Sequence, residues 1–269
     1  MTPSSSEPDE PFAAVAERSG LLRLVRKSYD VFSDYALKLP MACCPCGDCL
    51  SPERQKALAR YPTSRIPWEL VNAWQHAAAP SEYSGAFDRE VRYMTSRTFD
   101  LLAHGYDIND FGSEIELRRL RSARWKRWPD EERQNVQDFL DHYLLTAVSY
   151  ADVEGEDWPM LAQTRTGSSV LAMVVHVDGD LDRAFKTWER ASQESAALHM
   201  ADMRSEMAQG GGDIMYNPFL DGREEQVGRV TEWATSEAWT RRIEEAFFAV
   251  ADDHVQADVK RGLLSNGLQ

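Results

Sequence analysis

All four cysteines of the chain fall within seven residues, inside the stretch MACCPCGDCLSPE at positions 41 to 53. Two C-x-x-C spacings overlap there, one from Cys43 to Cys46 and one from Cys46 to Cys49. Two thiolates at this spacing can share one zinc ion, and the glycine that follows Cys46 lets the backbone turn toward the sulfur atoms. The candidate metal ligands are therefore Cys43, Cys44, Cys46 and Cys49.

The histidines of the chain do not complete a standard zinc site. Structural zinc sites take four ligands, and four from only seven residues would be crowded, since the side chains of the adjacent Cys43 and Cys44 usually diverge. A fourth ligand would more naturally come from a distant residue. The six histidines are scattered and none lies in an H-x₃₋₅-H pair: they are His76, His104, His142, His176, His199 and His254.

A redox thiolate and simple packing are the alternatives to metal binding. Cys49 precedes a helix start expected at Ser51 and Pro52, and the positive end of a helix dipole stabilises a thiolate. However, the sequence lacks the βαβ pattern of thioredoxin-like proteins. Buried cysteines also pack as small apolar side chains. We favour packing, then zinc, then redox chemistry.

Two other groups of residues carry chemically useful side chains. The stretch RRLRSARWKR at 118–127 holds six basic residues, which suits the binding of phosphate or carboxylate groups. Acidic residues flank this stretch on both sides, so we interpret it as a solvated helix face. His199, Asp202 and Glu206 have helical spacing and metal-competent side chains, but such triplets are common on polar helix faces. No catalytic motif is found, and no catalytic or cofactor-binding residue is assigned.

The elements that must position these residues are predicted to be helices. Between Asp130 and Tyr150 the apolar residues recur in steps of three and one along one stripe, which includes Phe139 and Leu144. Pro129 and the acidic residues after it favour a helix start. The segment VLAMVVHV at 170–177 is rich in β-branched residues, but we assign it to a helix because no second strand exists to pair with it. Further helices are expected at 12–18, 21–38, from 51, from 67, and at 87–104, 114–127, 160–177, 181–208 with a break near Ser195, 224–234 and 237–252.

The pattern as a whole predicts an all-α fold of about ten helices, and the lack of a fixed-period repeat argues against a regular solenoid. Residues 1–10 are rich in serine, proline and acidic residues and are expected to be a disordered tail. Residues 11–265 are expected to form a single domain, with two packed halves at 11–150 and 151–265 as the alternative.

Charge and hydropathy exclude several classes of protein. The formal net charge is −14, which argues against binding to nucleic acid or to anionic membranes. No apolar run reaches the roughly 18 residues that would span a bilayer, and the N-terminus does not look like a signal peptide. We therefore expect a cytoplasmic protein, in which clustered thiols would not form a disulfide framework.

The order of five segments resembles a set of bacterial all-helical proteins without an assigned function. The segments are CGDCLSPE, REVRYMTSRTFDLL, WKRWPDEERQNVQDFL, NPFLDG and RRIEEAFF. These are packing and turn signals rather than catalytic motifs, so the resemblance implies no activity. It does imply that Cys46, Cys49, Ser51 and Glu53 form one local unit.

The sequence favours a non-enzymatic protein that binds another protein. An acidic helical surface would attract a basic partner, which it would neutralise or chaperone as immunity proteins and secretion adaptors do. The alternative is an enzyme or sensor that uses the Cys43–Cys49 loop through zinc or a thiolate. Zinc is the one cofactor that this alternative implies. Neither nucleic acid nor a membrane is expected as a partner.

Overall fold

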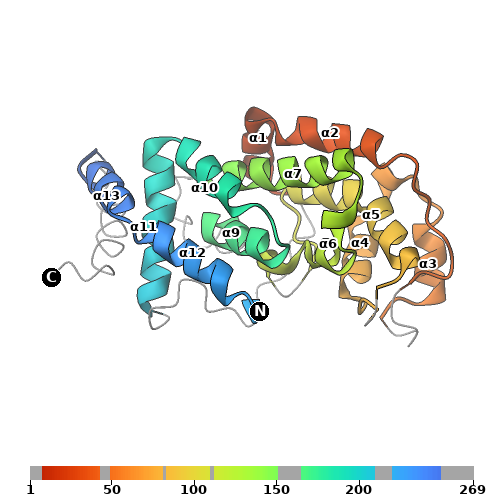
Figure 1. Ribbon diagram of the computed structural model, residues 1–269. Helices are drawn as coiled ribbons and strands as arrows, with labels where there is room; N and C mark the ends of the chain where they lie inside the picture. Colours follow the sequence, from red (N-terminus) through yellow and green to blue (C-terminus); the bar gives the residue numbers. More distant parts are fainter. Residues whose placement is uncertain are drawn as a thin grey trace. The chain divides into compact units, whose positions relative to one another are not determined.

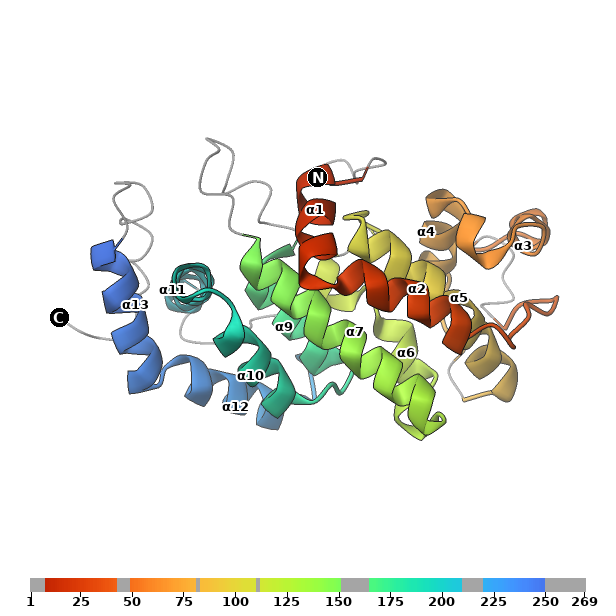
Figure 2. The same cartoon turned by 90° about the horizontal axis from the view of Figure 1, so that it is seen from above.

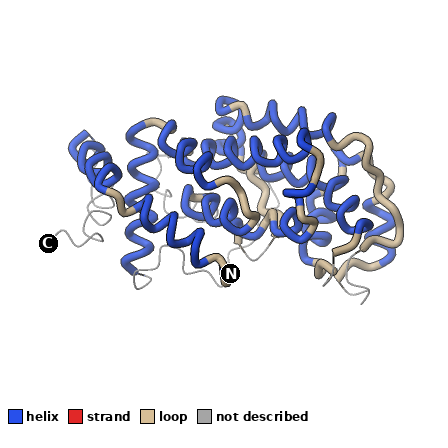
Figure 3. The backbone as a smooth tube through the Cα atoms, in the orientation of Figure 1, coloured by secondary structure: helices blue, strands red, loops and turns tan. Residues whose placement is uncertain are grey.

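Every regular element that the computed structural model shows is a helix (Figure 3). The structure describes residues 8–42, 49–80, 83–109, 112–150, 165–209 and 220–249. Twelve α-helices and three short 3₁₀ helices, but no strand, occur in these ranges. The prediction of an all-α fold is therefore confirmed, and segment 170–177 is helical rather than extended.

Contacts within the chain divide it into two units, unit 1 at residues 1–143 and unit 2 at residues 144–269. Unit 1 contains α1 (Glu10–Ser19), α2 (Leu21–Val31), α3 (Pro52–Leu58), α4 (Trp68–His76), α5 (Gly85–Ala103), α6 (Arg118–Ser122) and most of α7 (Asp130–Ser149). Unit 2 continues with α9 (Gly167–His176), α10 (Leu181–Arg190), α11 (Gln193–Gln209), α12 (Glu224–Ala234) and α13 (Glu237–Ala249). The 3₁₀ helices are η1 (Thr63–Arg65), η2 (Ser113–Ile115) and η3 (Trp125–Arg127). The expected single domain over 11–265 stays a prediction.

Short-range signals set several of the helix starts. The hydroxyl of Ser51 accepts the backbone N–H of Arg54 at 3.3 Å, and Pro52 occupies the first helical position of α3, as the sequence predicts. The carboxylate of Asp9 caps α1 in the same way, accepting the N–H of Phe12 at 2.9 Å. Each cap satisfies a backbone donor that has no partner within its own helix.

Helix α5 is the centre of unit 1. It contacts α1, α2 and α4, and α2 runs beside α5 and α7 in both ribbon views (Figures 1 and 2). Contacts between helices that are not neighbours in the chain distinguish this packing from a solenoid, in which each repeat touches only the next. The burial of long apolar and aromatic side chains against α5 therefore holds unit 1 together.

The stripe predicted on α7 lies in the core. Phe139 and Leu144 are fully buried. The ring of Phe139 stacks on that of Phe99 from α5, with the two planes 2° apart, and on that of Tyr143. Phe12 of α1 meets Tyr143 edge-on at 5.8 Å, so one aromatic column joins three helices.

Unit 2 is built around Trp233 of α12. Its indole stacks on Phe185 of α10 with centroids 4.4 Å apart, and it meets Trp188 and Trp239 edge-on. Helix α11 contacts α9, α10 and α13. Aromatic pairs in these geometries stabilise a core beyond the area that they bury.

Two predicted helices differ from the expectation for local reasons, and a third breaks close to the expected position. Segment 114–127 is split into η2, α6 and η3, and α6 is separated from η3 because Arg124 adopts a left-handed backbone with φ 55° that a helix cannot continue through. Helix α2 ends at Val31 instead of residue 38, where the hydroxyl of Ser33 donates to the carbonyl of Asp30 and competes with the helix ladder. The break expected near Ser195 lies at residues 191–192, just before α11.

No helix in the described part of the chain is both long enough and apolar enough to cross a lipid bilayer.

Candidate functional site

Three of the four candidate metal ligands, Cys43, Cys44 and Cys46, lie outside the described residues, so their assignment stays a prediction. The fourth, Cys49, is partly buried and stands directly before Leu50, whose side chain is fully buried. Among the residues that the structure does describe, no group of three or more His, Cys, Asp or Glu side chains gathers closely enough to hold a metal ion. Any zinc site of this segment would therefore depend on the three cysteines.

Both ends of the cysteine segment are held by Gln55 of α3. The side-chain carbonyl of Gln55 accepts the N–H of Met41 at 2.9 Å, and its amide donates to the carbonyl of Leu50 at 3.0 Å. Met41 and Leu50 are themselves buried. One amide thus joins the residues that flank positions 42–49, and the chain between them begins and ends at fixed points.

The carboxylate of Glu90 on α5 anchors the same segment to the core of unit 1. It accepts the N–H of Ala42 at 2.8 Å and the indole N–H of Trp74 at 2.6 Å. Glu90 is buried, and this burial raises the pKa of its carboxyl group despite the two donors and the nearby charge of Arg119. A carboxylate whose oxygens already accept strong donors is positioned to hold the loop rather than to act as a base.

Arg119, from the basic stretch, is buried beside this carboxylate instead of facing solvent. Its guanidinium lies 4.3 Å from the ring centroid of Trp74 and donates to the carbonyls of Trp74 and Ala77 at the end of α4. A cation at the C-terminal end of a helix is stabilised by the helix dipole. The prediction of a solvated face for 118–127 is therefore wrong for Arg119, whereas Arg121, Arg124, Lys126 and Arg127 are exposed.

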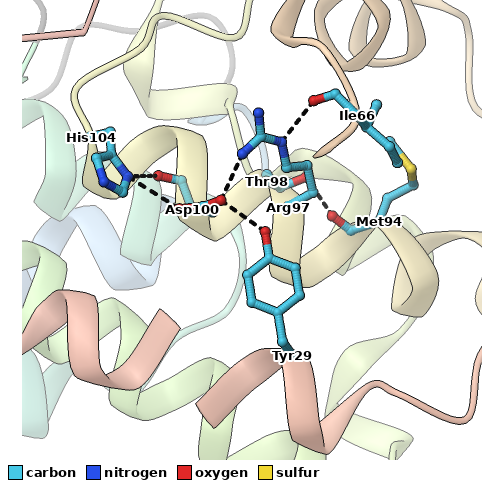
Figure 4. Close-up of polar contacts among 7 residues, drawn as sticks. All are labelled: Tyr29, Ile66, Met94, Arg97, Thr98, Asp100 and His104. Carbon is cyan, nitrogen blue, oxygen red and sulfur yellow. Dashed lines mark hydrogen bonds and ion pairs between the residues drawn. The ribbon is translucent and has the colours of Figure 1, made fainter. Parts of the chain in front are cut away.

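A second polar cluster on α5 is centred on Asp100 (Figure 4). Tyr29 donates its hydroxyl to the carboxylate at 2.8 Å, Arg97 lies 2.6 Å away, and Nδ1 of His104 lies 3.1 Å away. Arg97 also donates through Nε to the carbonyl of Ile66 at 2.8 Å. The carboxylate therefore ties α2, α5 and the segment before α4 to one another.

The protonation of this cluster suits a structural role. Burial would raise the pKa of Asp100, but the bonds from His104 and Tyr29 and the charge of Arg97 outweigh it and hold that pKa below its ordinary value. Burial and the adjacent carboxylate raise the pKa of Tyr29, so its phenol keeps its proton at neutral pH. His104 is the member of the cluster that can titrate near neutrality, and the hydrogen bond to Asp100 raises its pKa. The donors all point at Asp100 or Ile66 rather than toward a substrate.

The metal-competent triplet of α11 does not converge. His199 is buried, whereas Asp202 is half-buried and Glu206 is exposed. Nδ1 of His199 accepts the N–H of Gly167 at 3.4 Å, so the proton sits on Nε2, which donates to the carbonyl of Tyr150 at 3.3 Å. Burial lowers the pKa of His199 to about 4, and the ring stays neutral and structural.

Sequence reasoning missed the buried carboxylates Asp88 and Glu90 and the half-buried carboxylate Asp100 of α5. Asp88 accepts the indole N–H of Trp128 at 2.7 Å, which parallels the pair made by Glu90 and Trp74. One sequence signal could have found them. Acidic residues fall on the apolar faces of this helix in a chain rich in tryptophan, and a buried indole N–H needs an acceptor.

No protein-family model matches the chain, nor does any curated protein or solved structure. The site is therefore interpreted from its own geometry.

Proposed function

We propose that the chain is a protein-binding protein that engages a basic partner through unit 2. The observation that carries this proposal is the uneven distribution of charge. Residues 1–143 contain 22 acidic and 19 basic residues, a net charge of −3, whereas residues 144–269 contain 22 acidic and 11 basic residues, a net charge of −11. A surface of one sign steers an oppositely charged partner toward it and speeds association.

The outward side of α12 carries two of these acidic residues. The other side of the helix is docked through Arg223, which pairs with Asp178 of the turn before α10 at 2.9 Å, while the exposed Arg229, one turn after Glu225, pairs with the exposed Asp182 of α10 at 2.6 Å. The indole of Trp233 also donates to Glu189 at 3.0 Å.

The residues that face away from these contacts are Glu225, Gly228 and Glu232, which share one face by their i, i+3, i+7 spacing and are exposed. We call this surface the outer face of α12. A partner that meets it would find carboxylates held on a rigid helix, which suits lysine or arginine side chains.

Capture of partners from the native cell tests the proposal. A Glu225→Lys and Glu232→Lys double variant should lose a partner that the wild-type chain retains, and a Glu10→Lys and Glu17→Lys variant with the same change of charge on α1 should retain it. The association rate of the captured partner should fall as salt rises, because screening limits charge attraction to about 8 Å at physiological ionic strength. An association rate that salt does not change would contradict the proposal.

The two hydrogen bonds by which Gln55 joins Met41 and Leu50, which we call the Gln55 clasp, favour one second candidate function. It is a zinc or thiol site in the loop of Cys43, Cys44, Cys46 and Cys49. Zinc sites bind tightly when their ligands are held in place by surrounding hydrogen bonds. Such support would come from the N–H groups of Met41 and Ala42, which donate to Gln55 and Glu90, and from the amide of Gln55, which donates to the carbonyl of Leu50.

A further inference from the structure

Helix α2 meets α5 and α7 through a polar contact near its middle (Figures 1 and 2). Ser28 of α2 is fully buried, and its hydroxyl lies 2.9 Å from the side-chain oxygen of Asn135 on α7. The backbone carbonyl of Ser28 accepts the hydroxyl of Ser96 on α5 at 2.8 Å. Ser96 and Asn135 are buried as well. A contact that apolar side chains usually make between helices is therefore made here by two hydroxyls and an amide.

One donor of this contact has no acceptor. The amide nitrogen of Asn135 is buried and has no hydrogen-bond partner among the residues that the structure describes. A buried donor without a partner costs free energy, which is recovered when water reaches the group. Separation of α2 from α7 would therefore be favourable for the amide of Asn135.

Two further polar contacts hold α2 and the residues directly after it. Tyr29 donates its hydroxyl to Asp100 of α5 at 2.8 Å (Figure 4), and Tyr35 donates to Glu132 of α7 at 2.5 Å. The guanidinium of Arg92 on α5 donates to the hydroxyl of Tyr35 at 2.9 Å. Water can replace each of these bonds, so their net contribution is small relative to their strength in isolation.

A short exposed segment connects these helices to the rest of the described chain. Residues 36–40 form no helix, and all of them except Leu37 are exposed. The next residue, Met41, is buried and held by Gln55. The chain can therefore bend at 36–40 while the cysteine segment keeps its anchors. We call residues 9–35, which contain α1 and α2, the N-terminal arm.

Apolar contacts oppose the separation of the arm. The N–H of Asp9 also donates to the carbonyl of His104 at the end of α5, at 3.1 Å. Helix α1 packs on α2, so the two helices would move together. These contacts make the closed form the major one, and the polar contacts of α2 make opening less costly than unfolding of the whole unit. The apolar side chains that the two helices bury are Phe12, Val15, Ala16, Leu21 and Val25.

We infer that the N-terminal arm opens from α5 and α7 as one unit, bending at residues 36–40, while the rest of unit 1 stays folded. Opening uncovers a face of α5 and α7 that carries Arg92, Ser96, Asp100 and Asn135, all polar side chains that water solvates well. The arm therefore gates this face. The inference does not rest on the proposed function, which concerns unit 2.

Native-state hydrogen exchange of the full chain in increasing, sub-denaturing urea tests the opening. Helices as short as α1 and α2 lose most of their structure without tertiary contacts, so an open arm exposes its backbone amides to exchange. Peptides of α1 and α2 should exchange at least about tenfold faster than those of α4 and α5, with one shared dependence on urea. A smaller difference would overturn the inference, and so would a different urea dependence for α1 and α2, which would show separate fraying.

A single hydroxyl tests the hold of the arm on α5. Tyr29→Phe removes the bond to Asp100 and should speed exchange in both α1 and α2 by at least about threefold, with no change in α4. Tyr93→Phe is the matched control, because the hydroxyl of Tyr93 on α5 makes only a long contact of 3.5 Å with the carbonyl of Tyr61. It should leave the arm at the wild-type rate. Equal acceleration in α4 would show general destabilisation and overturn the gate.

The polar contact at Ser28 is tested in the opposite direction. Ser28→Ala with Asn135→Leu removes the unpaired amide and both side-chain partners, so exchange in α1 and α2 should slow by a factor of several. Faster exchange in a double variant that circular dichroism shows to be folded would overturn the role of this contact in opening. Tyr29→Phe, a milder change, tests the same interface if the double variant does not fold.

Discussion

The indole N–H of Trp74 donates to the carboxylate of Glu90 at 2.6 Å, and both side chains are buried. The same carboxylate accepts the N–H of Ala42, so it joins α4, α5 and the start of the cysteine segment. A buried acceptor with two donors is costly to remove, because each donor is then left in the core without a partner.

Replacing Glu90 tests how much these hydrogen bonds contribute to the free energy of unfolding. Glu90→Ala should lower the free energy of unfolding by about 3–5 kcal/mol, since it leaves two donors unsatisfied and removes one negative charge near the buried guanidinium of Arg119. Glu90→Gln keeps one acceptor oxygen and should cost less. Urea denaturation midpoints of the two variants measure the difference, and equal midpoints for Glu90→Ala and the wild-type chain would contradict the assignment.

The aromatic column of unit 1 gives a second prediction for stability. Phe139 is fully buried and its ring centroid lies 3.7 Å from that of Phe99, so Phe139→Ala leaves a large cavity and should cost about 3–5 kcal/mol. Gln134→Ala, at an exposed position on the same helix, should change the free energy of unfolding by less than about 0.5 kcal/mol. A denaturant midpoint for Phe139→Ala close to that of the Gln134→Ala control would mean that the column does not contribute to the core.

The fold was predictable because its signals are local. The stripe that contains Phe139 and Leu144 repeats with the helical period, and Ser51 with Pro52 marks a helix start that depends only on adjacent residues. The bounds of α12 agree with the predicted range of 224–234 for the same reason.

The polar network was not predictable because its partners are distant in sequence. Glu90 and Trp74 are separated by 16 residues, and Ser28 and Asn135 by 107. In the sequence, a buried charged residue of a helix cannot be distinguished from one on a solvated face. Arg119 was therefore assigned to the surface. Only the tertiary arrangement shows which carbonyls and rings receive its guanidinium.

Arg204 of α11 provides a matched test within unit 2. It is fully buried, its Nε donates to the carbonyl of Ala234 at the end of α12 at 2.7 Å, and its other nitrogens donate to the carbonyl of Ser236, between α12 and α13, and to the hydroxyl of Thr240 in α13. Burial lowers the pKa of Arg204 to about 10, so the side chain is still charged at neutral pH and depends on these acceptors.

Arg204→Ala should therefore cost about 3–5 kcal/mol of unfolding free energy, because it removes the donors that satisfy the end of α12. Arg229→Ala breaks an exposed pair with Asp182 and should cost no more than about 1 kcal/mol. Thermal or urea unfolding of both variants makes the comparison. Similar losses for the two arginines would argue against a special role for the buried one.

The pair of His104 and Asp100 predicts a dependence of stability on pH. The hydrogen bond from Nδ1 to Asp100 raises the pKa of His104, so the folded chain binds this proton more tightly than the unfolded chain does. The stabilisation is fully present below the ordinary pKa of about 6.5 and is lost as pH rises through the higher pKa of the folded state. Asp100 stays ionised over this interval because its own pKa is lowered.

The His104→Gln variant isolates this contribution. The difference between the unfolding midpoints of the wild-type chain and the variant should shrink as pH rises from about 5.5 to about 8.5. Tyr29→Phe removes a donor to Asp100 but leaves the imidazole in place, so it should keep the dependence on pH. Parallel profiles for the wild-type chain and His104→Gln would show that the imidazole does not contribute.

The cysteine segment yields the last prediction, which follows from the second candidate function. If the segment holds zinc, the chain purified in the presence of metal should contain about one equivalent, with at least three of Cys43, Cys44, Cys46 and Cys49 as ligands. Removal of the zinc should destabilise α3, since metal binding and folding are coupled in such sites.

In that case the hydrogen bonds of Gln55 to Met41 and Leu50 would hold the loop that carries the zinc ligands. Gln55→Ala should weaken zinc affinity by about 10–100-fold, the usual effect of losing a supporting hydrogen bond, whereas Lys56→Ala at the next, exposed position should not. Metal analysis and competition with a chelator measure both quantities. Less than about one tenth of an equivalent of zinc would contradict the site, because structural zinc is bound too tightly to be lost in purification. A chelator that leaves the unfolding midpoint unchanged would instead support cysteines that pack as small apolar side chains beside α3.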